Sequence, residues 1–525
     1  MAAEIEDKDI EAALSPAAEK DAEVEKEHGV QDAGQTTLQT TSSAEEVPYT
    51  IFTLNEKRFM AFILTFAALF SPISSTIYYP ALSPLAEQLH VSNSLINLSI
   101  TTFMIFQGFA PLFIGAFSDA EGRRPAYVIC FVIYIAADIG LALQTNYAAL
   151  LILRCVQSSG SSGTVSLANA VVADFSLPHE RGTWMGWANA GALLGPSIGP
   201  IIGGLLSQYL GWRSIFWFLA IFAGVYLLPI LLFFPESARK VVGNGSHRPG
   251  KFNRCLLDPV IKKRVDADPR IAGPPIAPHP LRFPNPFLTL KILFEPEASL
   301  VLISSGFLFA GFYGVMAGLP SQLQSSYGFD PLHVGLCFLA SGVGGSVASL
   351  LTGKLMDWNF HRHARRMGLD ASDTKKIRSL TSFPIEAARL ELALPFVVAG
   401  SAMTLGFGWT LRYKTYLGGP EIFLFFVGFC CTGAFTTLST LVVDLFIEQP
   451  ATATAAMNLT RCFLGAGATA AVVPMMDAIG AGWSFTIIAV IYAALVPPLL
   501  AIIRWGPGMR ARKDERLKRE GEGTI

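Results

Sequence analysis

The stretch YIAADIGLALQTNYAALLILRCVQSSG, residues 134–160, is apolar or small almost throughout, yet it holds one acid, Asp138, and one base, Arg154. A polar turn near Asn146 separates two apolar runs. Each run reaches about 20 residues, which is the length that a helix needs to cross roughly 30 Å of hydrocarbon. The stretch therefore predicts two neighbouring membrane-spanning helices joined by a tight turn.

The composition of the whole chain agrees with this prediction. Of 525 residues, 51% are hydrophobic and 15% are charged, with a mean hydropathy of +0.45; soluble proteins carry about 25% charged residues. Strand-like alternation is absent, so the spans are helices. We predict an all-α membrane protein with twelve transmembrane helices at 59–79, 95–117, 125–144, 147–172, 183–207, 214–235, 298–318, 332–354, 392–409, 421–443, 455–475 and 484–505.

Polar segments divide the chain into five parts. The first is rich in acidic residues, Ala, Ser and Thr and has no apolar run, which is typical of a disordered tail. A long polar stretch in the middle separates six spans from six. The predicted parts are a disordered acidic tail (1–57), an N-terminal six-helix lobe (58–235), a central loop (236–297), a C-terminal six-helix lobe (298–505) and a basic tail (506–525).

The basic residues orient the bundle. With a cytosolic N-terminus, only Arg213, Arg412 and Lys414 of the 39 Lys and Arg residues face the outside, and two lie within spans. The positive-inside rule favours that orientation. We expect a multi-pass protein of the cell membrane with both termini in the cytosol; the alternative location is the vacuolar membrane.

The sequence gives no sign of an enzyme. Six of the seven cysteines fall in spans and Cys255 falls in the central loop, so none is placed for an extracellular disulfide. No zinc-ligand spacing, phosphate-binding glycine loop or nucleophile elbow is present. We expect no cofactor, no metal and no nucleic-acid partner; the expected partners are the bilayer, a small molecule and protons, with a monomer as the functional unit.

The two halves carry ordered landmarks that suggest a repeat. Asp119 and Asp357 end corresponding spans at an offset of 238, and Asp174 and Asp444 do so at an offset of 270. The offset grows where the loop after the eighth span is longer than its partner. A parallel repeat predicts two lobes related by a pseudo-two-fold axis, with the substrate cavity between them.

Asp138 and Arg154 are each eight residues from the turn at Asn146. A rise of 1.5 Å per residue places both about 12 Å below the outer surface on antiparallel neighbours. An unpaired charge there costs at least about 2.5–3.5 kcal/mol, so we expect the two to pair. The pair is either a static structural contact or the place where Asp138 accepts and releases a transported proton.

Two further motifs carry glycines and charges. GAFSDAEGRR at 115–124 turns the chain at the cytosolic face, and its charges are either a topology signal or a gate whose ion pairs break in another state. The predicted gate residues are Gly115, Asp119, Gly122, Arg123, Arg124 and Asp174. GALLGPSIGPIIGG at 191–204 bends its helix at two prolines. Its small residues permit close helix contact, either as generic helix packing or as a contact that seals the interface between the lobes. Its key residues are Gly191, Gly195, Pro196, Gly199, Pro200 and Gly203.

These motifs, with RCVQSSG in the fourth span, PESARKVVGNGS after the sixth and NLTRCFLGAG in the eleventh, resemble the major facilitator superfamily. In particular they resemble fungal twelve-span drug:proton antiporters of the quinidine-resistance type, over roughly residues 55 to 505. The resemblance implies a plasma-membrane exporter that works by alternating access and inward proton flow. It implies proton coupling by Arg154, an antiporter motif around Gly195 and Pro196, and an inner gate at Asp119 and Arg123. One departure is Ser158, where the general motif has glycine.

The charges within the spans bear on the cargo. Arg154 and Arg461 stand against Asp138 alone, and such a cavity favours anionic or neutral molecules. The predicted cavity residues are Arg154, Gln157, Gln107, Arg461, Asn458 and Tyr313. We expect a proton-coupled exporter of drugs, toxic compounds or secondary metabolites. The alternatives are an exporter of organic anions such as di- or tricarboxylic acids and, less favoured by the antiporter motif, a proton-coupled importer.

Overall fold

The structure of the chain is a computed structural model that describes residues 48–177, 180–250, 253–268, 271, 273, 292–368, 383–446 and 450–522. Residues 47–525 form one compact unit. Every regular element in the described ranges is helical, as predicted. Residues 1–47 of the predicted acidic tail lie outside the described residues.

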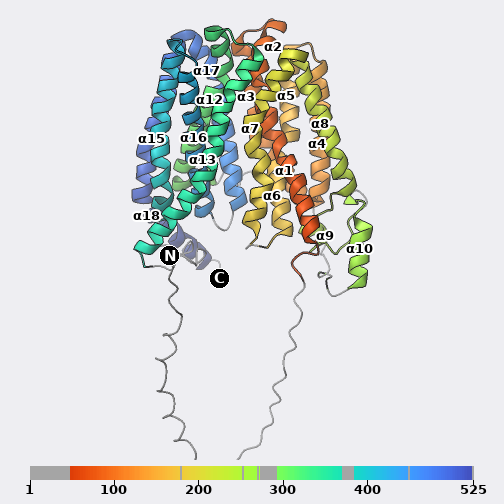
Figure 1. Cartoon of the computed structure of the whole chain (residues 1–525). Helices are drawn as coiled ribbons and strands as arrows, with labels where there is room; N and C mark the ends of the chain where they lie inside the picture. The colour runs from red at the N-terminus through yellow and green to blue at the C-terminus, as the bar shows by residue number, and fades with distance from the viewer. Residues whose placement is uncertain are drawn as a thin grey trace, which may run out of the picture. The chain divides into compact units, whose positions relative to one another are not determined.

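The first half of the chain forms one group of helices, coloured red to yellow-green in Figure 1. Its elements are α1 (Leu54–Thr76), the short 3-10 helix η1 (Tyr79–Ala81), α2 (Leu82–Gln88), α3 (Asn93–Glu121), α4 (Arg123–Leu143), α5 (Tyr147–Ser161), α6 (Gly163–Phe175), α7 (Arg181–Leu210) and α8 (Arg213–Phe233). We call these elements the first lobe. The end of the bundle where α1 begins is called the inner end, and the opposite end, which holds η1 and α2, the outer end.

The second half forms a second group beside the first (Figure 1). Two short helices, α9 (Arg239–Val242) and α10 (Asp258–Ala267), lie in the connecting segment. The second lobe consists of α12 (Pro296–Tyr327), α13 (Pro331–Arg366), α15 (Ile385–Arg412), α16 (Gly418–Leu445), α17 (Pro450–Ala494) and α18 (Val496–Glu522). This arrangement is the predicted two-lobed helical fold.

The described residues contain ten helical stretches that are long and apolar enough to span a membrane, where the sequence predicts twelve spans. The difference has two local causes. The predicted span 147–172 is divided into α5 and α6 at Ser162, and each part alone is short. The predicted spans 455–475 and 484–505 fall in one stretch, 452–511, which reverses at Gly480, whose φ of +79° and ψ of 160° are not helical. Both causes leave the twelve apolar segments in place.

The helix starts follow from their capping residues. The side chain of Thr53 accepts a hydrogen bond from the backbone N–H of Glu56, and the Glu56 side chain accepts one from Thr53, which completes a capping box. Ser92, Asn146 and Asp330 cap α3, α5 and α13 in the same way with a side-chain oxygen. These caps satisfy backbone donors that the first turn of a helix leaves free.

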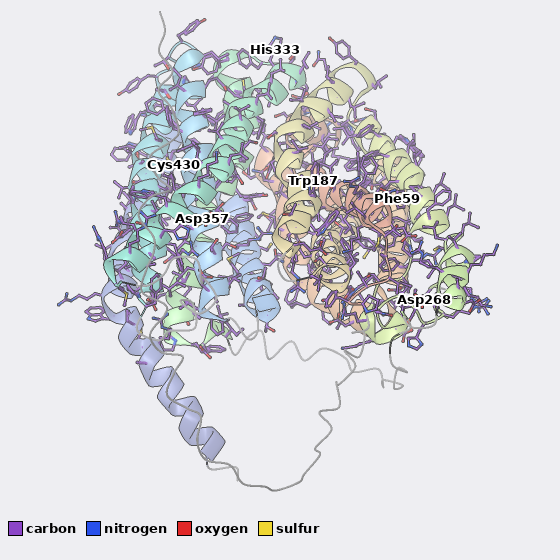
Figure 2. All side chains as sticks on the ribbon, turned by 60° about the horizontal axis from the view of Figure 1, so that its bottom comes forward. Phe59, Trp187, Asp268, His333, Asp357 and Cys430 are labelled. Carbon is purple, nitrogen blue, oxygen red and sulfur yellow. The ribbon has the colours of Figure 1, made fainter. Side chains whose placement is uncertain are left out.

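The lobes contact each other along two helix pairs, α7 with α13 and α3 with α17. Near the outer end, the backbone of Gly335 packs against Pro200, and Ser94 donates a hydrogen bond to Asp477 at 3.4 Å. Near the inner end, a Cβ added at Gly115, Gly186 or Gly353 would meet no other atom within 4 Å. Trp187 on α7 and Asp357 on α13 mark these inner segments in Figure 2, and Trp187 is 64% exposed. The lobes are therefore joined at their outer and middle parts.

The last residues of the predicted disordered tail, 48–57, are ordered against the connecting segment. Ile51 and Phe52 are buried, and the Ile51 N–H donates a hydrogen bond to the carbonyl of Asn244. Arg264 of α10 forms an ion pair with Glu56 at 2.8 Å. α1 begins at Leu54, so the ordered chain starts earlier than the composition indicates, because apolar side chains at 51 and 52 find a packing partner in the loop.

Candidate functional site

The stretch 134–160 forms α4, a short turn and α5, and its two charges lie fully buried between the helices. Gly160 allows the close approach, since a Cβ added there would lie 2.7 Å from the backbone nitrogen of Tyr134. The equal distance of both charges from the turn therefore does bring Asp138 and Arg154 to one region.

A third side chain stands between the two charges. Arg154 Nη1 donates a hydrogen bond to Gln157 Oε1 at 2.6 Å, and Gln157 Nε2 donates to Asp138 Oδ1 at 2.5 Å. The direct ion pair expected from the sequence is thus replaced by a bridge. Gln157 lies one helical turn after Arg154 on the same face, which explains how its amide reaches both groups.

The guanidinium of Arg154 is enclosed by residues that the sequence analysis missed. It lies 4.5 Å from the centroid of the Tyr78 ring and 4.3 Å from that of Phe103. Nη1 also donates to the carbonyl of Ser74 on α1 at 3.3 Å, and the Ser74 hydroxyl is 2.6 Å from that of Tyr134. The cluster of hydroxyl residues at 74–79, inside an apolar span, is a sequence signal for Ser74 and Tyr78, but the apolar run around Phe103 gives no such signal.

Four other predicted cavity residues lie where the lobes meet. Asn458 Nδ2 on α17 donates to the carbonyl of Gln107 on α3 at 3.1 Å, and Arg461 Nε donates to Asn458 Oδ1 at 3.0 Å. Gln107 Nε2 donates to Ser71 Oγ at 3.2 Å. Tyr313 on α12 stacks on Phe309 with 4.3 Å between ring centroids. Gln107, Asn458, Arg461 and Tyr313 therefore share one region with contributions from both lobes.

Arg461 differs from Arg154 in its partners. Its guanidinium lies over the rings of Phe309, at 4.9 Å, and Phe435, at 5.6 Å, and the residue is partly exposed. In the part of the chain that the structure describes, Arg461 takes part in no ion pair. A cation in a membrane-spanning helix without a carboxylate beside it is suited to bind an anion.

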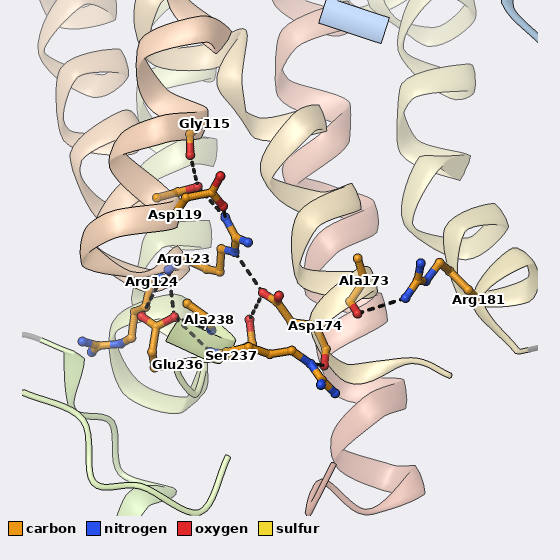
Figure 3. A network of polar contacts seen from close by, with 12 residues as sticks. Gly115, Asp119, Arg123, Arg124, Ala173, Asp174, Arg181, Glu236, Ser237 and Ala238 are labelled. Atoms are coloured by element: carbon orange, nitrogen blue, oxygen red, sulfur yellow. Dashed lines mark hydrogen bonds and ion pairs between the residues drawn. The ribbon is translucent and has the colours of Figure 1, made fainter. Parts of the chain in front are cut away.

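The GAFSDAEGRR motif forms the end of α3, a one-residue turn and the start of α4 (Figure 3). Gly122 makes the turn with φ +117°, a conformation that favours glycine. Arg123 then reaches two carboxylates: its Nη1 lies 2.5 Å from Asp119 Oδ1, and its Nε lies 2.9 Å from Asp174 Oδ2 at the end of α6. All of these ion pairs lie within the first lobe.

Glu236, which follows α8, holds the same turn and was not singled out from the sequence. Its Oε1 accepts hydrogen bonds from the backbone N–H groups of Arg123, Ser237 and Ala238, and its Oε2 accepts one from Arg124 (Figure 3). Burial raises the pKa of Glu236, while these N–H donors favour its charged form. Arg124, a predicted gate residue, donates a hydrogen bond from its Nη2 to the carbonyl of Leu231 at 2.6 Å.

Four glycines of the 191–204 motif lie against α1 and its C-terminal end within the first lobe, namely Gly191, Gly195, Gly199 and Gly203. Gly191 and Gly203 approach the carbonyls of Thr65 and Ile77, and Gly195 and Gly199 pack on Pro72 and Thr76. The contact with the second lobe is made by other residues of α7: Ser197 meets Gly342, Pro200 meets Gly335, and Gly204 meets Pro331. The expectation that the glycine face seals the lobes together is therefore corrected, because four-residue spacing puts that face on one side of α7 only. Pro196 and Pro200 lie inside α7 as predicted.

Comparisons with known proteins agree with the fold and with the kind of protein. Residues 64–470 match the Major Facilitator Superfamily. The chain is 41% identical over 510 residues to the MFS-type transporter tstD of Talaromyces stipitatus, covering 96% of this chain and 91% of tstD. It is 38% identical over 494 residues to Citrate exporter 1 of Aspergillus niger, covering 93% of each.

A solved structure supports the same architecture. The crystal structure of the human organic anion transporter MFSD10 (TETRAN) aligns with a TM-score of 0.53 and 21% sequence identity. The alignment covers 84% of this chain and 99% of that one. At this level of identity the likeness concerns the fold.

Proposed function

This chain belongs to the major facilitator superfamily, and from that premise we propose that it exports small organic molecules from the cytosol in exchange for protons, with organic anions as its main cargo. Membership makes it a multi-pass membrane transporter and not an enzyme. The coupling ion, the direction, the cargo and the location at the plasma membrane with both termini in the cytosol belong to the proposal. So does membership of the quinidine-resistance type of antiporter, which the motifs resemble.

The observation that carries the choice of cargo is the guanidinium of Arg461, which takes part in no ion pair with any other described residue. It lies on α17 near the contact with α3, and its Nε is held by Asn458, which is itself bound to Gln107 of the first lobe. A cargo anion at Arg461 supplies the charge that the protein does not. Since Asn458 bridges to α3, an anion bound there also contacts the place where the lobes meet.

The Asp138–Gln157–Arg154 bridge provides a route for proton coupling. An ionised Asp138 accepts from the amide N–H₂ of Gln157, which turns the amide oxygen towards Arg154. A protonated Asp138 presents an O–H donor to the N–H₂ group of Gln157, which weakens the hydrogen bond between them. If the Gln157 amide flipped to accept from Asp138, its N–H₂ group would face the guanidinium of Arg154, which can only donate. Protonation at Asp138 therefore changes the hydrogen bonding of Arg154.

The effect of Arg154 reaches the lobe contact through α1. Arg154 donates to the carbonyl of Ser74 on α1, and α1 is packed closely on the glycine face of α7. The opposite side of α7 contacts α13 of the second lobe at Gly335 and Gly342. A change at Arg154 is thus connected through α1 and α7 to the contact between α7 and α13.

The support for export has two parts. The first is the resemblance of residues 191–204 to an antiporter motif, together with the tight α1–α7 packing that the motif produces. The second is the 38% identity to a protein named as a citrate exporter. An importer of the same fold is the competing possibility.

A second class of cargo is favoured by a separate observation. The rings of Phe309, Tyr313 and Phe435 gather around Arg461, with Tyr313 stacked on Phe309. Flat aromatic molecules, charged or neutral, pack well against such rings. An aromatic acid can pack its ring against these side chains and pair its carboxylate with the guanidinium of Arg461.

The proposal is tested by measuring cell accumulation of radiolabelled citrate, benzoate and tetraphenylphosphonium, with and without the protein and with a protonophore. We expect the protein to lower the accumulation of at least one of the two acids, and the protonophore to abolish this difference. We expect the protein to leave the accumulation of the cation unchanged. Higher accumulation in cells that carry the protein would contradict export. Export of the cation alone would contradict the choice of anionic cargo.

A further inference from the structure

A groove on α18 plays no part in the proposed transport. α18 packs on α12, α15 and α17, which all belong to the second lobe, and it lies at the edge of the molecule in Figure 1. The groove has a volume of about 580 Å³, and the residues that line it all come from α18: Pro497, Pro498, Leu500, Ala501, Arg504 and Trp505. Spacings of three, four and seven residues place these side chains along one face of the helix. This face is turned to the lipid and not to the contact between the lobes.

The depth of Arg504 follows from a contact further along α18. Arg510 donates a hydrogen bond from its Nη2 to the carbonyl of Phe383 at 2.6 Å, just before the inner end of α15, which begins at Ile385. A rise of 1.5 Å per residue puts Arg504 about 9 Å from Arg510, towards the middle of the bundle. On α15, the predicted span begins at residue 392, about 10 Å from Ile385. Arg504 therefore lies level with the inner border of the apolar spans.

Arg504 has no counter-charge within the part of the chain that the structure describes. It is exposed and takes part in no ion pair with another described residue. Trp505 beside it is 63% exposed, and tryptophan is enriched at the level of the lipid headgroups. A guanidinium at this level meets phosphate groups, which its planar set of donors fits well.

The rest of the groove is apolar and extends towards the middle of the membrane. Pro497 lies about 10 Å from Arg504 along the helix, and Leu500 between them is 50% exposed. Pro497 and Pro498 stand in the first turn of α18, where backbone N–H groups lack a helical partner. Since proline has no N–H, no free donor is presented to the hydrocarbon there. A phospholipid has the same order, with the phosphate at the border and the acyl chains inside.

We propose that this groove binds an anionic phospholipid of the inner leaflet, with the lipid phosphate at Arg504 and one acyl chain along Leu500, Ala501 and Pro497. A zwitterionic lipid carries its own cation beside the phosphate, so an anionic lipid is the better counter-charge for Arg504. The site is independent of the cargo, the direction and the coupling ion of the proposed function.

The test uses the full chain in vesicles that contain a phospholipid with a photoreactive acyl chain, either phosphatidylglycerol or phosphatidylcholine. After illumination, mass spectrometry measures how much lipid is attached to residues 497–505. In the wild type we expect phosphatidylglycerol to label this segment about fivefold more than phosphatidylcholine, the effect of one basic residue at an anionic membrane surface. In Arg504→Gln the labelling by phosphatidylglycerol should fall to the level of phosphatidylcholine.

The matched control is Arg58→Gln. Arg58 is also exposed and stands directly before the predicted first span, but it lies outside the groove. We expect this variant to keep the wild-type labelling of residues 497–505. An equal loss in Arg58→Gln and Arg504→Gln would show attraction by general surface charge and would overturn the site.

A second variant, Ala501→Leu, fills the apolar part of the groove and keeps Arg504. We expect it to lower the labelling by both lipids and to keep the preference for phosphatidylglycerol, because the chain loses its place while the charge remains. Undiminished labelling in Ala501→Leu would overturn the placement of the acyl chain. Equal labelling of the wild type by the two lipids, or full labelling of Arg504→Gln by phosphatidylglycerol, would overturn the proposal as a whole.

Discussion

Arg154 in the first lobe and Arg461 in the second both lie in membrane-spanning helices near the contact between the lobes, and their surroundings differ. Arg154 is fully buried, bridged through Gln157 to Asp138 and enclosed by Tyr78 and Phe103. Arg461 is partly exposed and contacts the neutral Asn458 and aromatic rings, with no ion pair among the described residues. A buried arginine with its own acid has its charge balanced inside the protein, whereas one without an acid is free to take its counter-charge from a ligand. This difference is our reason for proposing that the proton binds in the first lobe and the cargo in the second.

The largest expected difference between the two sites is in stability. Arg154→Ala leaves Asp138 and Gln157 buried without their cation, and breaking a buried charge pair costs roughly 3–5 kcal/mol. Arg461→Ala removes a cation that has no acid beside it, and we expect a loss below about 1 kcal/mol. Thermal unfolding of both purified variants in the same detergent measures this. Equal losses would remove the basis of the comparison.

The next effect is on cargo affinity. Arg461→Gln removes the charge that attracts the anion, and we expect KM for the exported acid to rise about tenfold to hundredfold, the range for a hydrogen bond to a charged group. Arg461→Lys keeps the charge and recovers part of the affinity. A KM unaltered in both variants would show that the anion binds elsewhere.

A smaller effect is expected when the bridge is cut. Gln157→Leu removes two buried hydrogen bonds, worth about 1–3 kcal/mol together, and disconnects Asp138 from Arg154. We expect weaker stimulation of transport by a pH gradient, with a KM for cargo within about threefold of the wild type. The reverse result, a large change of KM with intact pH stimulation, would move Gln157 from the proton route to the cargo site.

The smallest expected effect is a pH dependence of thermal stability that comes from Glu236, which lies outside the proposed proton and cargo sites. Because burial raises the pKa of Glu236 in the folded protein, the unfolded chain loses this proton at lower pH than the folded one. The stabilisation is therefore complete below about pH 4.3, the ordinary glutamate pKa, and is lost as pH rises through the higher folded value. Relative to Glu236→Gln, which cannot ionise, the wild type should lose thermal stability as pH rises over this window. A Tm difference that is constant with pH would contradict this.

The sequence predicted the fold and part of the site because those parts depend on local rules. Apolar segment lengths gave the helices, and the fixed rise of a helix brought Asp138 and Arg154 to one depth. The insertion of Gln157, the rings of Tyr78 and Phe103 around Arg154, and the capping of α4 by Glu236 depend on packing between distant segments, which periodicity does not contain. The glycine face of α7 shows the same limit: its spacing predicted a close helix contact, but only the assembled lobe shows that the partner is α1.

The central claim, that Asp138 carries the proton and Arg461 binds the cargo, is tested most directly by Asp138→Asn in reconstituted vesicles. Two activities of each vesicle preparation are compared for the exported acid: exchange of labelled for unlabelled acid, and accumulation driven by a pH gradient. The account predicts that Asp138→Asn keeps exchange near the wild-type rate and loses gradient-driven accumulation, while Arg461→Gln loses both. Gradient-driven accumulation by Asp138→Asn at the wild-type level would contradict the assignment.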